Sequence, residues 1–128
     1  AEQAGTIFIL STIATSSIEE VAAAAPNATK WFQLYVYNDR QVTINLIRRA
    51  EKAGFKALVL TVDTPFFGVR RADVRNKFAL PRHLKLANFE GHLSSKINES
   101  RGGGSALNEY VQSLFDESLQ WKDVEWLK

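Results

Sequence analysis

The chain has 128 residues, of which 45% are hydrophobic and 23% are charged, with 7 Gly and 3 Pro. This composition fits one globular domain and excludes a disordered, collagen-like or low-complexity protein. No apolar run approaches the about 20 residues that span a membrane, and no N-terminal secretory signal is recognisable, so no membrane partner is expected. The absence of Cys excludes disulfides and thiolate metal sites, and we expect no metal. The net charge of +2 is too balanced for overall attraction to nucleic acid.

The first predicted elements are a strand and a helix. A short apolar, β-branched run at residues 6–10 predicts a strand covered on both faces. Ser16 and Ser17 each precede a Glu by three residues, which is a doubled capping box and predicts the start of a helix. That helix runs through Val21 and four alanines, and Pro26 ends it.

The same order of elements then recurs. Residues 31–36 predict a second strand, and Asn38 or Asp39 caps a second helix that Gly54 closes. The third predicted strand, residues 57–62, follows after two residues. The apolar stripe of the second helix consists of Val42, Leu46, Ala50 and Ala53, with Ile47 beside it. Alternating apolar strands and helices predict an α/β fold with a parallel sheet and right-handed βαβ crossovers.

The regular pattern stops after the third strand. Between about residues 64 and 105 neither period is sustained, and Pro and Gly recur. A loop of this length is unusual, so we expect it to be functional or mobile. Helical spacing resumes at residues 107–115, and a last amphipathic segment follows at 121–127. We interpret residues 1–128 as a single domain with this long irregular loop.

A sheet of three parallel strands has two open edges and a limited core. We therefore interpret the chain as part of a larger α/β architecture. Copies of the chain are expected to associate through the sheet edges and the exposed apolar face, giving a homo-oligomer. The absence of Met, even at position 1, favours a processed chain or a piece of a longer protein.

Polar residues interrupt all three predicted strands at the same end. Ligands of parallel α/β sheets bind at the carboxyl ends of the strands, and the polar residues there are Ser11, Thr12, Gln33, Tyr35, Thr61 and Asp63. Residues two apart on a strand share a face. Either these side chains satisfy neighbouring backbone and begin a turn, or they form a ligand site, and the pattern leaves both interpretations open.

A basic segment follows the third strand. Six Lys or Arg residues lie between Arg70 and Lys85, against a single acidic residue. Such a segment is either a solvated loop or an anion-binding surface. We expect no nucleic-acid partner, because Phe78 alone is interleaved for base stacking. His83 and His92 are expected to be exposed loop residues.

Seven short motifs occur in an order and spacing that are specific together. They are STIATSS at 11–17, QLY at 33–35, TVDTP at 61–65, RR at 70–71, VRNKF at 74–78, LANFE at 86–90 and WKDVEWL at 121–127. In these motifs the chain resembles the FMN-dependent 2-hydroxy-acid oxidases, the glycolate oxidase or hydroxyacid oxidase family, over essentially its whole length. The resemblance implies a partial TIM barrel whose three parallel strands correspond to strands 2 to 4, with FMN at the carboxyl face.

The resemblance also implies roles for residues that bind the cofactor. Ser11, Gln33 and Thr61 match residues that hydrogen-bond the flavin ring, whose edge offers acceptors and a donor. Ile13 stands where short-chain glycolate oxidases carry Trp, so the resemblance leaves the preferred substrate open.

The remaining roles concern a small 2-hydroxy acid. Tyr35 matches a catalytic tyrosine that contacts the substrate hydroxyl or carboxylate. Asp63 matches the catalytic-site aspartate that orients the catalytic histidine and favours its charged form. Arg70 matches an arginine that binds the substrate carboxylate, for which a guanidinium fork is suited. The parent reaction oxidises a 2-hydroxy acid to a 2-oxo acid and reduces O2 to H2O2.

Several parts of the family's site have no match in this chain. Neither His83 nor His92 occupies the position of the catalytic histidine, and the family's second substrate arginine, flavin-side lysine and phosphate site lie on later strands. We therefore expect the isolated chain to bind little or no FMN and to be catalytically incomplete. The alternative is an enzyme that becomes active when another chain supplies the missing strands. The resemblance implies a peroxisomal location. The C-terminal tripeptide that directs the family to peroxisomes is absent from this chain, and without it a cytoplasmic location is expected.

Overall fold

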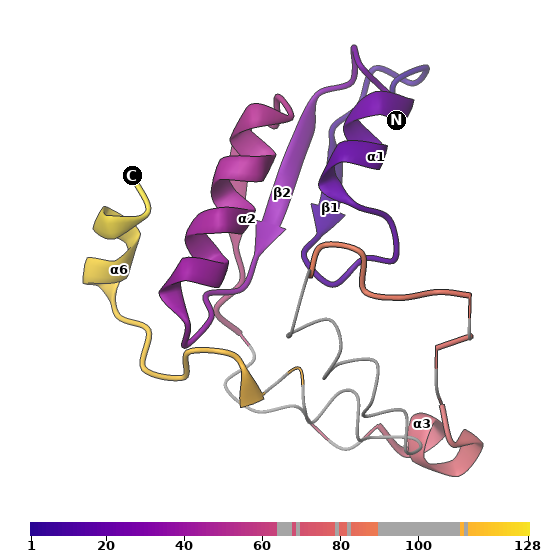
Figure 1. Cartoon of the computed structure of the whole chain (residues 1–128), viewed down its shortest axis with the longest axis vertical. Coiled ribbons are helices and arrows are strands. Elements are labelled where there is room, and N and C mark those ends of the chain that lie inside the picture. The colour runs from indigo at the N-terminus through magenta and orange to yellow at the C-terminus, as the bar shows by residue number, and fades with distance from the viewer. Residues whose placement is uncertain (64–67, 69, 79, 82, 90–110, 112) are drawn as a thin grey trace.

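The computed structural model describes residues 1–63, 68, 70–78, 80–81, 83–89, 111 and 113–128 (Figure 1). The elements of these residues follow one another as β1 (Phe8–Ser11), α1 (Ile18–Ala24), β2 (Lys30–Leu34), α2 (Arg40–Lys52), β3 (Ala57–Leu60), α3 (Arg71–Asn76) and α6 (Trp121–Trp126). The strands form one parallel sheet in the order β1-β2-β3, with α1 and α2 as the connections. The predicted parallel sheet is confirmed.

Local capping chemistry sets the helix ends. Ser17, not Ser16, begins α1: its hydroxyl accepts from the Glu20 N–H at 3.1 Å, and the Glu20 carboxylate accepts from the Ser17 N–H at 2.7 Å. Asp39 begins α2 by accepting from the N–H of Gln41 at 2.9 Å. Gly54 follows α2 with φ +81°, the left-handed conformation that glycine adopts at low cost.

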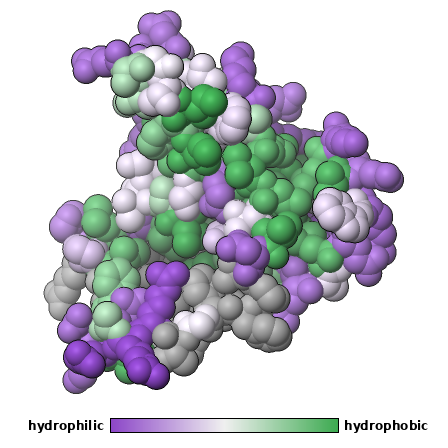
Figure 2. Space-filling model, turned by 180° about the vertical axis from the view of Figure 1, so that it is seen from behind, coloured by the Kyte–Doolittle hydropathy of each residue, from purple (hydrophilic) through white to green (hydrophobic). Residues whose placement is uncertain are grey.

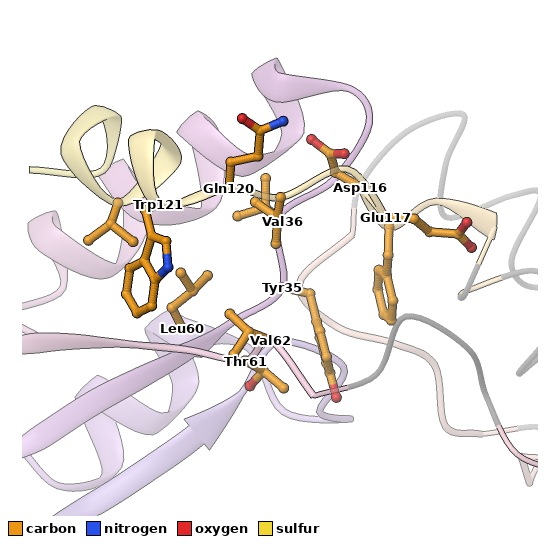
Figure 3. A pocket seen from close by; sticks show the side chains of 12 residues that line it. Tyr35, Val36, Leu60, Thr61, Val62, Asp116, Glu117, Gln120 and Trp121 are labelled. Atoms are coloured by element: carbon orange, nitrogen blue, oxygen red, sulfur yellow. The ribbon is translucent and has the colours of Figure 1, made fainter.

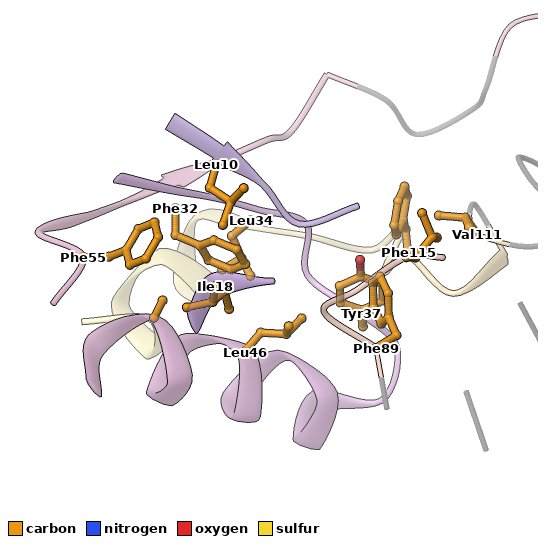
Figure 4. Packing of buried hydrophobic residues seen from close by; sticks show 12 residues of the cluster. Leu10, Ile18, Phe32, Leu34, Tyr37, Leu46, Phe55, Phe89, Val111 and Phe115 are labelled. Carbon is orange, nitrogen blue, oxygen red and sulfur yellow. The ribbon is translucent and has the colours of Figure 1, made fainter. Parts of the chain in front are cut away.

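The main core lies between the sheet and the two crossover helices. Along β2 the side chains alternate, so Phe32 and Leu34 are buried beneath the helices while Gln33 lies on the opposite face. Figure 4 shows the two β2 residues packed with Leu10 against Ile18 of α1 and Leu46 of α2. Burial of this helix-facing layer is the main source of stability in the described residues.

The opposite face of the sheet is not covered by α1 or α2. Figure 2 shows apolar side chains gathered on this side of the molecule, seen from behind the helices. Ile9 of β1 is 48% exposed and Val62, just after β3, is 68% exposed. The expectation that the first strand is covered on both faces is therefore wrong for this chain, because both helices pack on one side. We call this uncovered side the open face.

The C-terminal segment joins the body at the carboxyl end of β2. The N–H of Asn38 donates to the Leu114 carbonyl at 2.9 Å, and the N–H of Asp116 donates to the Val36 carbonyl at 2.8 Å. Tyr37 and Phe115 form an antiparallel bridge between them. Residues 107–110 of the predicted helix lie outside the described residues, whereas residues 111 and 113 have helical backbone.

The segment expected to be irregular contains one short helix. α3 (Arg71–Asn76) is followed by its C-cap Lys77, whose φ of +49° places it in the left-handed region. The expectation of no regular element there is wrong for this stretch. Further along, Leu86 and Phe89 are buried against the body, while most of residues 90–110 lie outside the part that the structure describes.

Candidate active site at the carboxyl ends of the strands

Three polar side chains form a row across the open face. Ser11 of β1 pairs in register with Gln33 of β2, so both project from the same side of the sheet. Gln33 pairs in turn with Val59 of β3, and Thr61 lies two residues further on that face. The N–H of Thr61 donates to the Leu34 carbonyl at 2.9 Å, which extends the strand pairing to this point. We call Ser11, Gln33 and Thr61 the polar row.

Hydrogen bonds orient the amide of Gln33 within the polar row. Its Oε1 accepts from the N–H of Thr12 at 3.2 Å, and its Nε2 donates to the Thr61 hydroxyl at 2.7 Å. The hydroxyl of Thr12 also donates to the main-chain carbonyl of Gln33. The Nε2 group keeps a second N–H, which it can donate to a ligand.

Both hydroxyls of the polar row, those of Ser11 and Thr61, keep a hydrogen that they can donate. The Thr61 oxygen accepts from Gln33 and so keeps its own hydrogen to donate. The Ser11 oxygen accepts from the N–H of Ile13 at 3.3 Å and likewise keeps its hydrogen. Each of the three side chains therefore keeps a hydrogen that it can donate to a ligand. Such a row suits a planar ligand whose edge carries acceptors.

Tyr35 lies beside the polar row, in a cavity of about 510 Å³. Figure 3 shows Tyr35 and Thr61 lining this cavity between the carboxyl ends of β2 and β3 and the C-terminal segment. The Tyr35 ring stacks on the ring of Phe115, with centroids 4.3 Å apart and planes 13° from parallel. Phe115 thus fixes the plane of the Tyr35 ring, a contact that the sequence did not predict.

The structure brings four of the six predicted site residues to one end of the sheet and leaves two apart. Asp63 is exposed, three residues beyond the end of β3, and Arg70 is exposed at the N-cap of α3. Figure 1 shows α3 well separated from the strands. Their predicted roles remain predictions. His83 is exposed in a turn, as expected, and His92 lies outside the described residues.

Two buried polar residues support the polar row: Thr12, one of the polar residues noted at the strand ends, and Asn88, for which the sequence indicated no role. Thr12 is fully buried and holds Gln33 by two hydrogen bonds. Asn88 is 3% exposed; its Oδ1 accepts from the N–H of Ile18 at 2.9 Å, and its Nδ2 donates to the Thr12 carbonyl at 3.1 Å. Asn88 belongs to the LANFE motif at 86–90, which contributed to the family resemblance but indicated no role for this amide.

Ion pairs hold the C-terminal segment, residues 113–128, next to the cavity. Arg40 at the start of α2 forms ion pairs with Asp116 at 2.5 Å and Asp123 at 3.1 Å, and its guanidinium lies 4.8 Å from the centre of the Trp126 ring. Hydrogen bonding from the Ser118 hydroxyl lowers the pKa of Asp116, and the charge of Arg40 lowers it further. This cluster holds the segment that carries Phe115.

Tyr37 is buried beneath the same segment. Its ring packs edge-on against Phe89 and Phe115, with centroids 5.6 and 5.4 Å away. Burial raises the pKa of the Tyr37 phenol well above its ordinary value. Its hydroxyl has no hydrogen-bond partner among the described residues. Tyr37 therefore stays neutral and is a packing residue rather than an acid or base.

Neither a cluster of metal ligands nor a membrane-spanning helix occurs among the described residues. No three His, Cys, Asp or Glu side chains of that part of the chain gather as metal ligands. Within the same residues no helix has the length and apolar character needed to cross a membrane.

Comparison with known proteins identifies relatives of the whole chain. A sequence model described as FMN-dependent dehydrogenase matches residues 1–128. Glycolate oxidase 3 of Arabidopsis thaliana is 54% identical over 125 residues, which are 98% of this chain and 33% of that protein. 2-Hydroxyacid oxidase 1 of Homo sapiens is 52% identical over 125 residues, 97% of this chain and 34% of that protein. The chain thus spans about a third of the length of these curated relatives.

Solved structures give the same fold. A mandelate oxidase determined with (S)-4-hydroxymandelic acid matches with a TM-score of 0.79 and 38% identity, over 98% of this chain and 34% of the other. A soluble mutant of (S)-mandelate dehydrogenase from Pseudomonas putida matches with a TM-score of 0.76 and 34% identity, over 98% and 34%. Because the chain covers about a third of these barrels, the predicted partial TIM barrel is confirmed.

Proposed function

The chain belongs to the FMN-dependent dehydrogenase family, and we propose that its 128 residues supply part of the flavin-ring and substrate site of a 2-hydroxy-acid oxidase. The proposed overall reaction converts a 2-hydroxy acid to a 2-oxo acid and O2 to H2O2. The observation that carries this proposal is the polar row, which presents three donors side by side at the carboxyl ends of parallel strands.

The chemistry of the polar row fits FMN. Along one edge the isoalloxazine ring carries two carbonyl oxygens, which accept hydrogen bonds, and a ring N–H, which donates one. Ser11, Gln33 and Thr61 would hold this edge with their remaining hydrogens. When bound, FMN supplies the two-electron chemistry that the side chains of this chain cannot perform. The residues of the row would orient the ring and shield it from water.

Tyr35 is the proposed substrate-contacting residue. It shares a cavity with Thr61, and its stack on Phe115 limits the directions in which its hydroxyl can point. A positioned tyrosine hydroxyl can donate to a substrate hydroxyl or carboxylate. Asp63 and Arg70 are proposed to orient the catalytic histidine and bind the substrate carboxylate, respectively. Asp63 lies two residues after Thr61 of the polar row, whereas the role of Arg70 would require the start of α3 to lie near that row.

We further propose that these 128 residues by themselves have negligible oxidase activity and little affinity for FMN. Among the described residues no histidine lies at the polar row, since His83 is exposed in a turn elsewhere. The loss of a general base alone costs about 10²–10⁴-fold in rate. The alternative is that the chain is active when complemented by the rest of the barrel from another chain.

The open face supports a proposal about partners. Ile9 and Val62 remain exposed there, and apolar surface of this kind is covered in stable proteins. We propose that a second copy of the chain, or the remaining strands of the barrel, covers it. A molar mass in solution equal to one chain, together with a single sharp unfolding transition, would contradict the second-copy proposal. A peroxisomal location is proposed on the family relationship alone.

One experiment separates the activity proposals. The purified chain is assayed for H2O2 with a series of 2-hydroxy acids and added FMN, alone and with a fragment of a relative that lacks the matched third. We expect no H2O2 from the chain alone. H2O2 formation in the mixture, reduced at least tenfold by Gln33→Ala and unchanged by Asn45→Ala on the exposed side of α2, supports complementation. Turnover by the chain alone, with one FMN bound per chain, would overturn the proposed incompleteness.

A further inference from the structure

Asn88 connects a distant segment to the loop after β1. Its Nδ2 donates to the Thr12 carbonyl at 3.1 Å and its Oδ1 accepts from the Ile18 N–H at 2.9 Å. Both bonds are buried, and they span 76 and 70 residues of sequence. The N–H of Ala87 adds a bond to the Ala14 carbonyl at 3.0 Å. The loop between β1 and α1 is therefore fixed by main-chain and side-chain bonds to residues 87–88.

The fixed loop carries the group that orients Gln33. Thr12 is 0% exposed, and its N–H donates to Oε1 of Gln33 at 3.2 Å. If the Gln33 amide turned over, its NH2 group would face the Thr12 N–H, which places two donors against each other. The Thr61 hydroxyl, 2.7 Å from Nε2, can donate as well as accept and would then donate to Oε1, so it does not by itself select an orientation. The position of the Thr12 peptide therefore decides whether Gln33 presents a donor or an acceptor on the open face.

We propose that Asn88 is a positioning residue of the polar row: it holds the Thr12 backbone so that the Gln33 amide presents an N–H to the ligand. Asn88 is buried on the helix side of the sheet and acts through two successive hydrogen bonds. As a role in binding the flavin ring, this inference rests on the proposed function. The orientation of the Gln33 amide does not, because it can be measured without a ligand.

Asn88 could either position Thr12 or only stabilise the fold, and its two side-chain hydrogen bonds allow these roles to be tested separately. The bond to the Ile18 N–H caps the first turn of α1 and would serve stability alone. Asn88→Asp keeps an oxygen for Ile18 but removes the donor to Thr12, so it breaks the positioning bond and retains the cap. Asn88→Ala removes both. Asn45→Ala, on the exposed side of α2, is the matched control.

The readout is the side-chain amide of Gln33, followed by NMR in the 128-residue chain, with Gln33→Ala used to assign the resonance. In the unmodified chain, one amide proton should exchange slowly with solvent because it is bonded to Thr61. We expect Asn88→Asp to accelerate that exchange by about fivefold to tenfold, which corresponds to the loss of one buried hydrogen bond. Asn88→Ala should do at least as much, and Asn45→Ala should leave the exchange rate unchanged.

Two results would overturn the positioning role. One is a Gln33 amide whose shifts and exchange are the same in Asn88→Asp as in the unmodified chain. The other is an acceleration equal to that of every other side-chain amide, which would mean general loosening. FMN fluorescence titrations of the same variants, each mixed with the fragment of a relative that lacks the matched third, test the flavin part separately. Failure of the mixture with the unmodified chain to bind FMN counts against the proposed flavin site, while the amide exchange still decides the role of Asn88.

Discussion

Replacing Lys30 by methionine should destabilise the chain far more than the same change at an exposed lysine. Lys30 is only 3% exposed, and its Nζ donates to the carbonyls of Ala25 at 2.6 Å, Ala28 at 3.0 Å and Pro26 at 3.4 Å. These carbonyls lie at the end of α1 and in the turn that follows. α1 has no basic residue in its last turn. Lys30 therefore supplies the positive charge that the C-terminal end of a helix favours.

The magnitude follows from the two shorter contacts. A hydrogen bond to a charged group contributes about 1.5–3 kcal/mol net, and charge at a helix end adds about 0.3–1 kcal/mol. Burial of the ammonium opposes these contributions, so we expect Lys30→Met to lower the free energy of unfolding by about 2–4 kcal/mol. Methionine keeps most of the apolar stem, and the loss therefore reports on the ammonium rather than on packing.

Urea unfolding followed by tryptophan fluorescence measures this effect, because Trp31 is adjacent in β2. Lys56→Met is the control: Lys56 is exposed and lies immediately before β3. The control should change stability by less than about 0.5 kcal/mol. Lys30→Arg, which keeps the charge and the donors, should recover part of the loss. Equal midpoints for Lys30→Met and the control would refute the reasoning.

Three further changes test the C-terminal segment. The pKa of Asp116 is lowered in the folded chain, chiefly by the hydroxyl of Ser118. The ionised carboxylate therefore adds to the free energy of unfolding above the ordinary Asp pKa of about 3.9, and this contribution is lost as the pH falls below it. Asp116→Asn should accordingly make the urea midpoint fall less steeply in acid. Burial raises the pKa of Tyr37 in the folded chain. The neutral phenol therefore leaves the free energy of unfolding at its full value below the ordinary tyrosine pKa of about 10, and stability is lost at higher pH. Tyr37→Phe, which removes a hydroxyl without a partner among the described residues, should change stability at neutral pH by no more than about 0.5 kcal/mol and weaken the alkaline loss, as followed by circular dichroism. Phe115→Leu should cost about 0.5–1.5 kcal/mol beyond the lost area, by removing the stack on Tyr35, and should shift the Tyr35 ring resonances in an NMR spectrum.

Features that depend on a few neighbouring residues were predictable from the sequence. The capping box at Ser17, the cap at Asp39 and the left-handed Gly54 all follow from side chains within three positions of each helix end. The three strands follow from short apolar runs, although β3 ends at Leu60, two residues earlier than expected. Local patterns establish which elements exist better than where each one ends.

Coverage and burial were less predictable because they depend on the partners of an element. The apolar run of β1 is the same whether one face is covered or two, and here Ile9 is left exposed. In α2 Val42 of the predicted apolar stripe is only partly buried, whereas Thr43, which lies outside that stripe, is fully buried. Its hydroxyl accepts from the N–H of Tyr37 at 2.9 Å, a bond that helical periodicity cannot indicate.

In the candidate site, too, some features were predictable from the sequence and others were not. The polar row was predictable because the carboxyl ends of parallel strands meet at one edge, so polar residues at those ends are brought together by topology alone. The contacts that orient the row were not predictable. Asn88 and Phe115 reach Thr12 and Tyr35 across more than seventy residues, and no short pattern relates such positions.

The two faces of the sheet have separate tasks, and this separation has a physical consequence. Leu10, Phe32 and Leu34 on the covered face are buried by α1 and α2, so this helix-facing layer favours the observed register of the strands. The polar row and its apolar neighbours lie on the open face. The partner that covers this face determines how far water is excluded from the row. Hydrogen bonds from the row to a ligand strengthen as water is excluded, because the local dielectric falls. Covering the open face should therefore raise ligand affinity steeply while leaving the strand register unchanged.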